Sequence, residues 1–240
     1  KRVLGFGSKL TASTLVAVLS RNAPELFLGK LQSLTAAGLY SRSYGLVQMF
    51  NRLFVDAVGA VCLPWFARQR REHGSFVEPF IKSTAYVTAF GWSFCLALVC
   101  LAQPVVRLLY GHQWDQAVDL VRLLAVAMTF SVPAALCETA LLSAGAVGTI
   151  ARVTGFAAIQ TVAFVAIGAT QGLMALGSAM IVAAAVTATL WLRATTRHIA
   201  IPWLELLPEL GRSAAVALTT AIGPAVALVL YGPYPEVRLW

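Results

Sequence analysis

The stretch Ala85-Tyr-Val-Thr-Ala-Phe-Gly-Trp-Ser-Phe-Cys-Leu-Ala-Leu-Val-Cys-Leu-Ala102 lies in the middle of the sequence, and no charged residue interrupts it. An α-helix needs about 20 mostly apolar residues to cross the hydrocarbon core of a bilayer, which is about 30 Å thick. With the residues before it, this stretch forms an apolar segment over 76–102. The sequence therefore predicts a transmembrane helix there.

The composition of the whole chain agrees with this prediction. Of its 240 residues 59% are hydrophobic and only 12% are charged, whereas soluble domains carry roughly 25% charged residues. These figures exclude a soluble domain, a disordered chain, a disulfide scaffold and a coiled coil. The net charge of +8 would suggest nucleic acid in a soluble protein, but in a membrane protein basic loops set orientation, and we expect no nucleic-acid partner. The fold class predicted is an all-α integral membrane protein.

About seven apolar segments are long enough to cross a membrane. They are residues 4–29, 44–66, 76–102, 117–145, 150–170, 172–191 and 213–231. The fifth and sixth segments meet at Thr170, Gln171 and Gly172. A break this short predicts a tight helical hairpin. We expect residues 1–195 to form a transporter-like lobe of about six transmembrane helices, and residues 196–240 to add a cytoplasmic amphipathic segment and one further transmembrane helix.

The basic residues predict which way the chain faces. With about seven crossings, eleven Lys and Arg residues fall on the side of Lys1 and of the loop after Arg68, five fall on the other side, and Arg21 and Arg52 remain inside spans. Because Lys and Arg concentrate in cytoplasmic loops, the side of Lys1 is predicted to be cytoplasmic. The chain begins without methionine or a signal-peptide pattern, so we expect it to be an internal fragment of a longer protein.

Two connections are amphipathic, and four spans contain proline. Residues 103–119 and 197–212 mix tryptophan and leucine with charged side chains, which predicts short helices at the outer and the cytoplasmic interface. Proline removes a backbone hydrogen bond and kinks a helix. The kinks are expected at Pro24, Pro64, Pro133 and Pro224. The cysteines have no metal-ligand spacing and are interpreted as packing residues: Cys62, Cys95, Cys100 and Cys137.

Five ionisable residues fall inside the predicted spans. Arg21 and Glu25 are four residues apart in the first span, Arg52 and Asp56 are four apart in the second, and Glu138 lies in the fourth. Each charge at the bilayer centre costs roughly 2.5 to 3.5 kcal/mol on insertion scales. Such residues therefore face the interior of a bundle or an aqueous cavity rather than lipid.

Two interpretations of these residues remain open. In the first, each pair is an intrahelical ion pair that faces another helix. In the second, the two helices face one aqueous cavity whose guanidinium groups receive an anionic ligand, since the planar fork of arginine suits phosphate. The second interpretation predicts a substrate-binding set that includes the two neighbouring asparagines, whose amides suit sugar hydroxyls: Arg21, Asn22, Glu25, Asn51, Arg52, Asp56 and Glu138.

Signals for catalysis and cofactors are weak. No glycine-rich phosphate loop, zinc motif or nucleophile elbow occurs. The pair His112 and Asp115 could belong to an acyltransferase, but no nucleophile accompanies it. We therefore predict no catalytic residue, no metal site and no cofactor.

Three stretches in the first part of the chain resemble a known family. They are Gly38-Leu-Tyr-Ser-Arg-Ser-Tyr-Gly-Leu-Val-Gln48, Cys62-Leu-Pro-Trp-Phe-Ala-Arg68 and Pro104-Val-Val-Arg-Leu-Leu-Tyr-Gly-His-Gln-Trp114. In order and spacing they are similar to polysaccharide flippases of the Wzx type. These flippases form one branch of the multidrug, oligosaccharidyl-lipid and polysaccharide exporter superfamily.

The resemblance implies an architecture and a position within it. Members have two similar helical lobes around a central cavity, with roughly twelve to fourteen spans in all. This chain resembles the second, C-terminal lobe, so the N-terminal lobe of the same protein is an implied partner. The first helix of that lobe usually contains Arg-Asn-Leu-Asp before a glycine. Arg21, Asn22 and Gly29 match, but Pro24 takes the place of the aspartate and Glu25 follows it.

The resemblance also implies a function. A flippase of this type moves undecaprenyl-pyrophosphate-linked oligosaccharide repeat units across the bacterial inner membrane for the synthesis of O-antigen, capsule or exopolysaccharide. The implied partners are the lipid-linked oligosaccharide, membrane lipids and the polysaccharide polymerase machinery. The alternatives are a drug or peptidoglycan-precursor exporter of the same superfamily, a membrane-embedded glycosyl- or acyltransferase, and a non-transporting scaffold subunit. Convergence of Arg21 and Arg52 on one cavity would favour transport, and convergence of His112 and Asp115 on an interfacial pocket would favour an enzyme.

Overall fold

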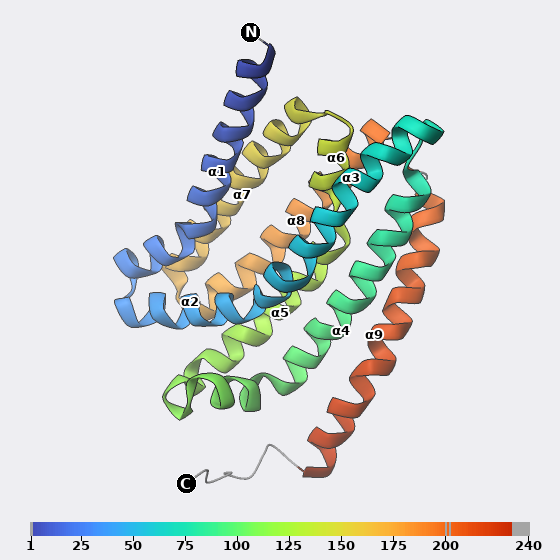
Figure 1. The fold of residues 1–240 in the computed structure, drawn as a ribbon. Coiled ribbons are helices and arrows are strands. Elements are labelled where there is room, and N and C mark those ends of the chain that lie inside the picture. Colours follow the sequence, from blue (N-terminus) through green and yellow to red (C-terminus); the bar gives the residue numbers. More distant parts are fainter. Residues whose placement is uncertain (1, 200, 202, 232–240) are drawn as a thin grey trace.

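The computed structural model describes residues 2–199, 201 and 203–231, and all the regular structure within these residues is helical. Within these residues, eight α-helices of 14 to 34 residues form the bundle. Short helical segments join them (Figure 1). In chain order the segments are α1 (Arg2–Leu31), α2 (Leu34–Val47), the π-helix η1 (Asn51–Val55), α3 (Asp56–His73), α4 (Val77–Tyr110), the 3-10 helix η2 (His112–Ala117), α5 (Val118–Ser131), the 3-10 helix η3 (Val132–Ala134), α6 (Cys137–Ser143), α7 (Val147–Gln171), α8 (Leu173–Ile199) and α9 (Trp203–Tyr231). The expected all-α membrane fold is confirmed.

Five stretches of the described chain are long and apolar enough to cross a membrane, by length and composition alone. They are Leu34–His73, Val77–Tyr110, His112–Ser143, Val147–Gln171 and Leu173–Ile199. The chain is thus a multi-pass membrane protein. Helices α1 and α9 have 30 and 29 residues, which is also long enough at about 1.5 Å per residue. Their assignment as the first and seventh spans remains a prediction.

The second span differs from its prediction. It begins ten residues earlier than expected, because Ser33 caps α2 by accepting a hydrogen bond from the backbone N–H of Ala36 over 3.0 Å. Its path is also bent: in Figure 1, α2 runs across the view from the lower end of α1, and α3 rises from its end. The π-helix η1 joins the two, and a π-turn is wider than an α-turn. The predicted second span, 44–66, thus falls within a longer stretch, Leu34–His73, whose bend at η1 was not predicted.

Neither of the two segments predicted to lie at the interfaces forms, in its described residues, one separate short helix. Residues 103–110 continue α4 beyond a break at Leu101 (φ −100°, ψ 16°), and only η2 follows before α5. The break lies three residues before Pro104, a proline that the predicted kinks omitted. Residues 197–212 are divided between the end of α8 and the start of α9, although residues 200 and 202 lie outside the described part. Both segments extend long helices, in which Val106 and Leu206 are buried while Leu108, Leu109 and Leu207 are exposed.

The fourth predicted span, 117–145, is interrupted at its proline. Helix α5 ends at Ser131, Pro133 lies in η3, and α6 begins at Cys137. The interruption packs tightly on α4, since a Cβ atom on Gly91 would lie 2.5 Å from Cγ1 of Val132. The expected hairpin between the fifth and sixth spans is confirmed, with Gly172 at φ 111° between α7 and α8.

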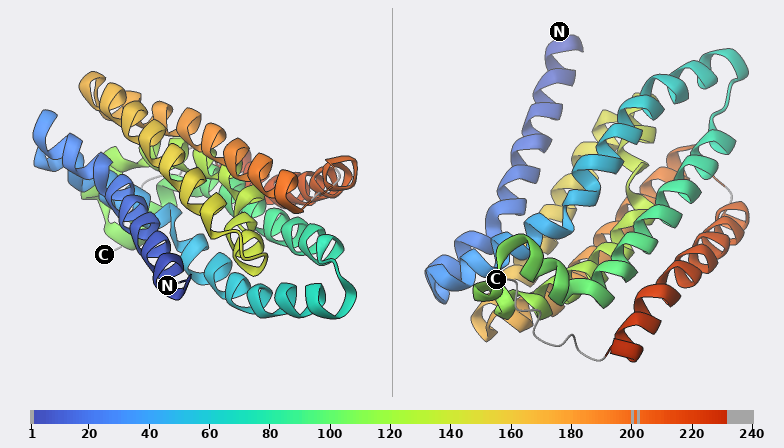
Figure 2. Two further views of the ribbon diagram at one scale, coloured as in Figure 1. Left: turned by 90° about the horizontal axis from the view of Figure 1, so that it is seen from above. Right: turned by 60° about the horizontal axis from the view of Figure 1, so that its bottom comes forward.

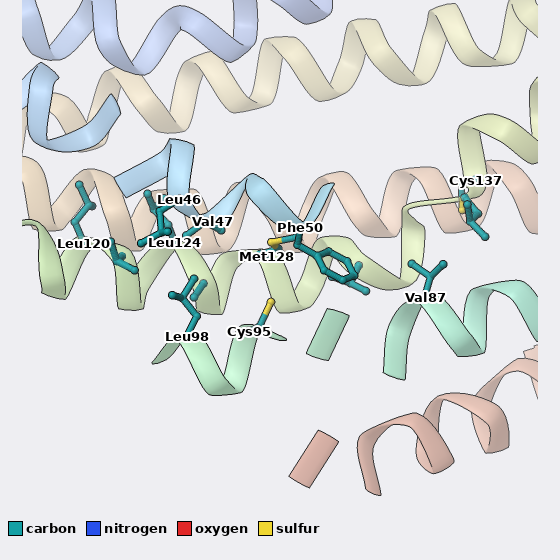
Figure 3. Close-up of a cluster of buried hydrophobic side chains, with 14 of the residues drawn as sticks. Leu46, Val47, Phe50, Val87, Cys95, Leu98, Leu120, Leu124, Met128 and Cys137 are labelled. Carbon is teal, nitrogen blue, oxygen red and sulfur yellow. The ribbon is translucent and has the colours of Figure 1, made fainter. Parts of the chain in front are cut away.

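The core lies between α2, α4, α5 and α8. Phe50 stacks on Phe54 and Phe94, with ring centroids 5.1 and 5.4 Å apart, and the labelled side chains around it in Figure 3 come from α2, α4, α5 and α6. Three of the four cysteines are buried, Cys100 is half-buried and all four are free. Their interpretation as packing residues is confirmed.

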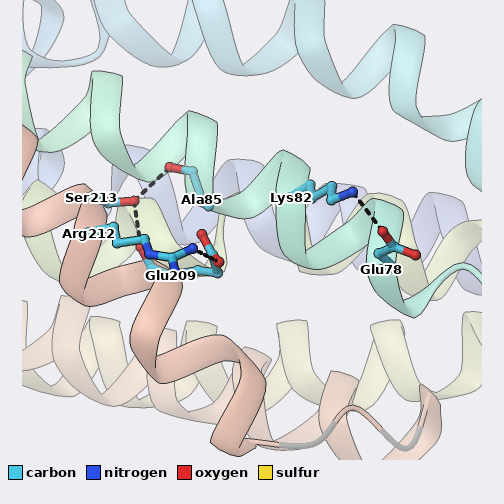
Figure 4. A network of polar contacts seen from close by, with 6 residues as sticks. All are labelled: Glu78, Lys82, Ala85, Glu209, Arg212 and Ser213. Carbon is cyan, nitrogen blue, oxygen red and sulfur yellow. Dashed lines mark hydrogen bonds and ion pairs between the residues drawn. The ribbon is translucent and has the colours of Figure 1, made fainter.

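Helix α9 lies along α4 on one side of the bundle, while α1 lies along α7 on the other (Figures 1 and 2). The hydroxyl of Ser213 on α9 donates to the backbone oxygen of Ala85 on α4 over 2.9 Å (Figure 4). The ion pairs nearby, such as Lys82 with Glu78 at 2.6 Å, are exposed. Exposed pairs of this kind contribute little to stability, so packing holds α9 in place. The division at residue 195 remains a prediction.

Accessible cysteines will test the orientation. His73, at the end of α3, and His112, at the start of η2, are both exposed and lie at opposite ends of the bundle. In a background without the four native cysteines, we expect His112→Cys to react with a membrane-impermeant thiol reagent in intact cells. We expect His73→Cys to react only after permeabilisation, because the basic loop is cytoplasmic. The reverse pattern would overturn the orientation.

Candidate functional site

Three adjoining cavities form a polar cleft between α1, the α2–η1–α3 path, α7 and α8. We call them the charged chamber, the neutral chamber and the side chamber, with volumes of about 460, 190 and 440 Å³. Tyr44 and Thr187 line all three. The chambers are therefore parts of one cleft, which passes through an otherwise apolar bundle.

The charged chamber brings together residues that are far apart in the sequence. Arg21 reaches it from α1, Arg52 from η1, Asp56 from the start of α3 and Glu138 from α6. Trp191 on α8 lies across from them. The side chamber shares Arg21, Glu138 and Trp191 with it. The charges of the two predicted spans thus converge on one cavity, together with the charge of the fourth.

Several polar side chains of the second span reach the cleft. Tyr44, Gln48 and Asn51 are spaced four and three residues apart, and the side-chain amide of Asn51 donates to Oε1 of Gln48 over 2.6 Å. In η1 the backbone N–H of Asp56 bonds to the oxygen of Asn51, one residue further than in an α-helix. Asn51 and Arg52 of this turn both line the charged chamber.

The charges in this chamber balance. Among its described lining residues, Arg21 and Arg52 supply two positive charges, and Asp56 and Glu138 supply two negative charges. No nitrogen–oxygen contact within 4.0 Å joins Arg21 to Glu25 or Arg52 to Asp56 within the described chain. The interpretation of these residues as intrahelical ion pairs is therefore wrong. Both guanidinium groups remain free to bind oxygen atoms of a ligand.

Two members of the predicted set lie elsewhere. Asn22 is exposed and its side-chain amide donates to the backbone oxygen of Val18 over 2.9 Å. Glu25 is half-buried, one turn further along α1. Neither residue lines one of the three chambers. On a regular α-helix, adjacent residues point about 100° apart, so Arg21 can face the cleft while Asn22 does not.

Sequence reasoning missed several neutral residues of the cleft. Tyr44 and Gln48 lie four apart on α2, and Thr187 and Trp191 lie four apart on α8. Polar or amphipathic residues at this spacing within an apolar span share one helix face. The same spacing indicated the charged pairs, and it would also have indicated these neutral residues.

The alternative enzymatic pair does not form a site. Both oxygens of the Asp115 carboxylate accept hydrogen bonds from Arg107, at 2.9 and 2.8 Å. His112 is exposed, and neither His112 nor Asp115 lines the polar cleft. Asp115 acts as the partner of Arg107 and holds η2 against the end of α4. Within the described residues, no group of three or more His, Cys, Asp or Glu side chains could hold a metal ion.

The sequence is similar to proteins of polysaccharide synthesis and transport. Residues 1–119 match the family described as "Polysaccharide biosynthesis protein". The succinoglycan biosynthesis transport protein ExoT of Rhizobium meliloti (strain 1021) is 26% identical over 170 residues, which are 70% of this chain and 34% of the relative. The teichuronic acid biosynthesis protein TuaB of Bacillus subtilis (strain 168) is 25% identical over 52% of this chain and 26% of its own length.

A third relative carries the name that the sequence motifs suggested. The lipopolysaccharide biosynthesis protein WzxC of Escherichia coli (strain K12) is 24% identical over 51% of this chain and 25% of its own length. The expected resemblance to polysaccharide flippases is thus confirmed. The chain spans about a quarter to a third of the length of these relatives. No solved structure matches it.

Proposed function

We propose that this chain, as a relative of polysaccharide biosynthesis and transport proteins, is one lobe of a flippase for lipid-linked oligosaccharides in the bacterial inner membrane. The observation that carries the proposal is the convergence of Arg21 and Arg52 in a cleft within an apolar helical bundle. A lipid-linked oligosaccharide has an apolar tail, a pyrophosphate and a glycan. Only the last two need a polar path, and the cleft provides one.

The charged chamber suits the pyrophosphate. Each guanidinium presents several N–H donors in a plane and can bind two phosphate oxygens at once. In the empty chamber, Asp56 and Glu138 balance the charge of the arginines, which limits the cost of keeping them in the membrane. When the ligand enters, phosphate oxygens replace water around Arg21 and Arg52. When it leaves, the carboxylates again balance the two positive charges, and this favours release.

The remaining parts of the protein complete the proposal. An N-terminal lobe of the same protein would form the opposing wall of the cleft, because Arg52 and Asp56 are exposed in this chain. Residues 1–195 would form the lobe itself, and residues 196–240 would add the interfacial segment and the last span. Membrane lipids would surround both lobes, and the polymerase machinery would receive the translocated glycan. The same resemblance to polysaccharide flippases implies that the lipid carrier is undecaprenyl and that the membrane is the bacterial inner membrane.

Other functions have less support. A drug exporter would need few hydrogen-bonding groups, whereas a peptidoglycan-precursor exporter would use the same pyrophosphate chemistry as the proposed flippase. A transferase would need a catalytic group at an open site, but Arg107 occupies the carboxylate of Asp115. A scaffold subunit would not need charged residues in a cleft. The name of one relative, the succinoglycan biosynthesis transport protein, agrees with a transporter rather than an enzyme.

Deletion of the gene in its own host will test the function. We expect lipid-linked oligosaccharide to accumulate in the inner leaflet and surface polysaccharide to fall, with both restored by the wild-type gene. The glycan should have the same mass in both strains, since a transporter leaves it unchanged. An altered glycan would favour a transferase, accumulation of peptidoglycan precursor would favour that exporter, and an unchanged leaflet distribution would contradict the proposal.

A further inference from the structure

The neutral chamber differs in chemistry from the charged chamber that it adjoins. Its polar lining consists only of uncharged groups, and no Asp, Glu, Lys or Arg is among its described lining residues. Five residues line both chambers, so the two spaces are continuous: Tyr44, Gln48, Asn51, Ser131 and Thr187. A ligand with an anionic part and a neutral polar part would therefore fit the cleft in one orientation, with its anionic part in the charged chamber and its neutral part in the neutral chamber.

One wall of the neutral chamber is an aromatic ring held in a fixed position. The ring of Tyr44 stacks on Tyr40, with centroids 5.5 Å apart and an angle of 12° between the planes. Its neighbour Gln48 is held by the amide of Asn51 at 2.6 Å. A pyranose ring presents C–H groups on one face and hydroxyls at its edge. The C–H groups pack on an aromatic ring, and the hydroxyls form hydrogen bonds with amides.

The opposite wall supplies hydroxyl groups. The side-chain Nε2 of Gln160 on α7 lies within hydrogen-bond distance of three acceptors: Oγ1 of Thr187 at 2.6 Å, Oγ1 of Thr161 at 3.1 Å and the backbone oxygen of Ala183 at 3.1 Å. The amide nitrogen has two hydrogens to share among them, and its contact with Thr187 is the shortest. A hydroxyl that accepts in this way keeps its own hydrogen to donate. Thr187 lines the neutral chamber, so its hydroxyl can donate to a ligand oxygen while the amide fixes its position.

We infer that the neutral chamber binds an uncharged sugar ring, the one attached directly to the pyrophosphate. This inference rests on the proposed function, because it places the pyrophosphate in the charged chamber next to it. A uronic acid in the same position would bring a carboxylate into a space with no cation in its described lining. Burying an unpaired charge is far more costly than burying a hydroxyl that forms hydrogen bonds. The chamber therefore selects neutral sugars over acidic ones at this position of the glycan.

Binding to the purified full-length protein in lipid nanodiscs will test the inference. Three short-chain polyprenyl pyrophosphates serve as probes: one without sugar, one carrying glucose and one carrying glucuronic acid. The wild-type protein should bind the glucosyl ligand about tenfold or more tightly than the glucuronosyl ligand, since an unpaired buried carboxylate is disfavoured. Equal affinity for the two glycosides would overturn the inference.

A variant that fills only the neutral chamber separates the two parts of the site. Ala184 lines the neutral chamber and not the charged one, whereas the adjacent Ala185 lines neither. In Ala184→Phe the glucosyl ligand should lose its advantage over the sugar-free ligand, and the affinity for the latter should stay within about twofold, because Ala184 does not line the charged chamber that receives the pyrophosphate. Ala185→Phe is the matched control and should behave as the wild type.

The outcomes distinguish the inference from the proposed function. If Ala184→Phe weakens the sugar-free and glucosyl ligands equally, the neutral chamber does not bind the sugar, while the flippase proposal stands. If the wild-type protein binds none of the three pyrophosphates, the proposed function fails and the inference fails with it.

Discussion

Replacing Arg52 by alanine is expected to abolish export of the glycan while the amount of protein in the membrane stays nearly unchanged. Loss of one partner in a desolvated charge pair costs roughly 2–5 kcal/mol, or about 30-fold and more in affinity. Arg52→Lys should restore export only in part, because an ammonium keeps the charge but lacks the planar fork. Lipid-linked intermediates in each leaflet and immunoblots of membranes measure the two effects.

The structure explains why abundance should not fall. Asp56 is exposed and forms no ion pair with Arg52, so alanine does not leave a buried carboxylate without its partner. Arg68→Ala is a suitable control, since Arg68 lies on the exposed surface of α3 and pairs with Glu72. It should export normally, because exposed pairs of this kind contribute little.

A double variant distinguishes the ligand role from charge balance. In Arg52→Ala with Asp56→Ala, both charges of this segment are absent. If Arg52 binds pyrophosphate, export should remain absent at normal abundance. Recovery of export in the double variant would show that Arg52 only balances Asp56, and the ligand role would have to be abandoned.

The sequence could predict the convergence of charges because the physical constraint is local. A charge in an apolar span has few stable positions, and a shared cavity is one of them. Arg21, Arg52, Asp56 and Glu138 therefore lie where that constraint indicated. Similarly, a segment of three residues between two apolar runs permits little besides the hairpin at Gly172.

The path of the second span could not be predicted because distant contacts determine it. Phe50 stacks on Phe94 of α4, and the adjacent η1 changes which side chains face the cleft. Asn22 and Asn51 illustrate the consequence, since each is next to an arginine in the sequence. The side-chain amide of Asn22 bonds to the backbone of α1 outside the cleft, whereas Asn51 and Arg52 line the same chamber. Nothing in the local sequence distinguishes the two asparagines.

The chain alone is expected to insert into the membrane but to export no glycan. Its core packs α2, α4, α5 and α8 together without any further chain, so a stable bundle should form. The cleft, however, has an open side on which Arg52 and Asp56 are exposed. Translocation requires a path that is closed to one side of the membrane at a time. One lobe can bind the pyrophosphate, but it cannot enclose it.

Reconstitution of the chain and of the longer protein in separate liposomes will measure this difference. An impermeant lectin measures the amount of lipid-linked oligosaccharide in the outer leaflet. This amount should change with time only in the liposomes that contain the longer protein. The reagent pattern of His73→Cys and His112→Cys checks that the chain has inserted in its proper form. Transport by the chain alone would show that one lobe is sufficient or that two copies rebuild the cavity. A crosslink between copies at Arg52→Cys, on the exposed side of the cleft, would identify the second case, because two open clefts that face each other bring these positions together.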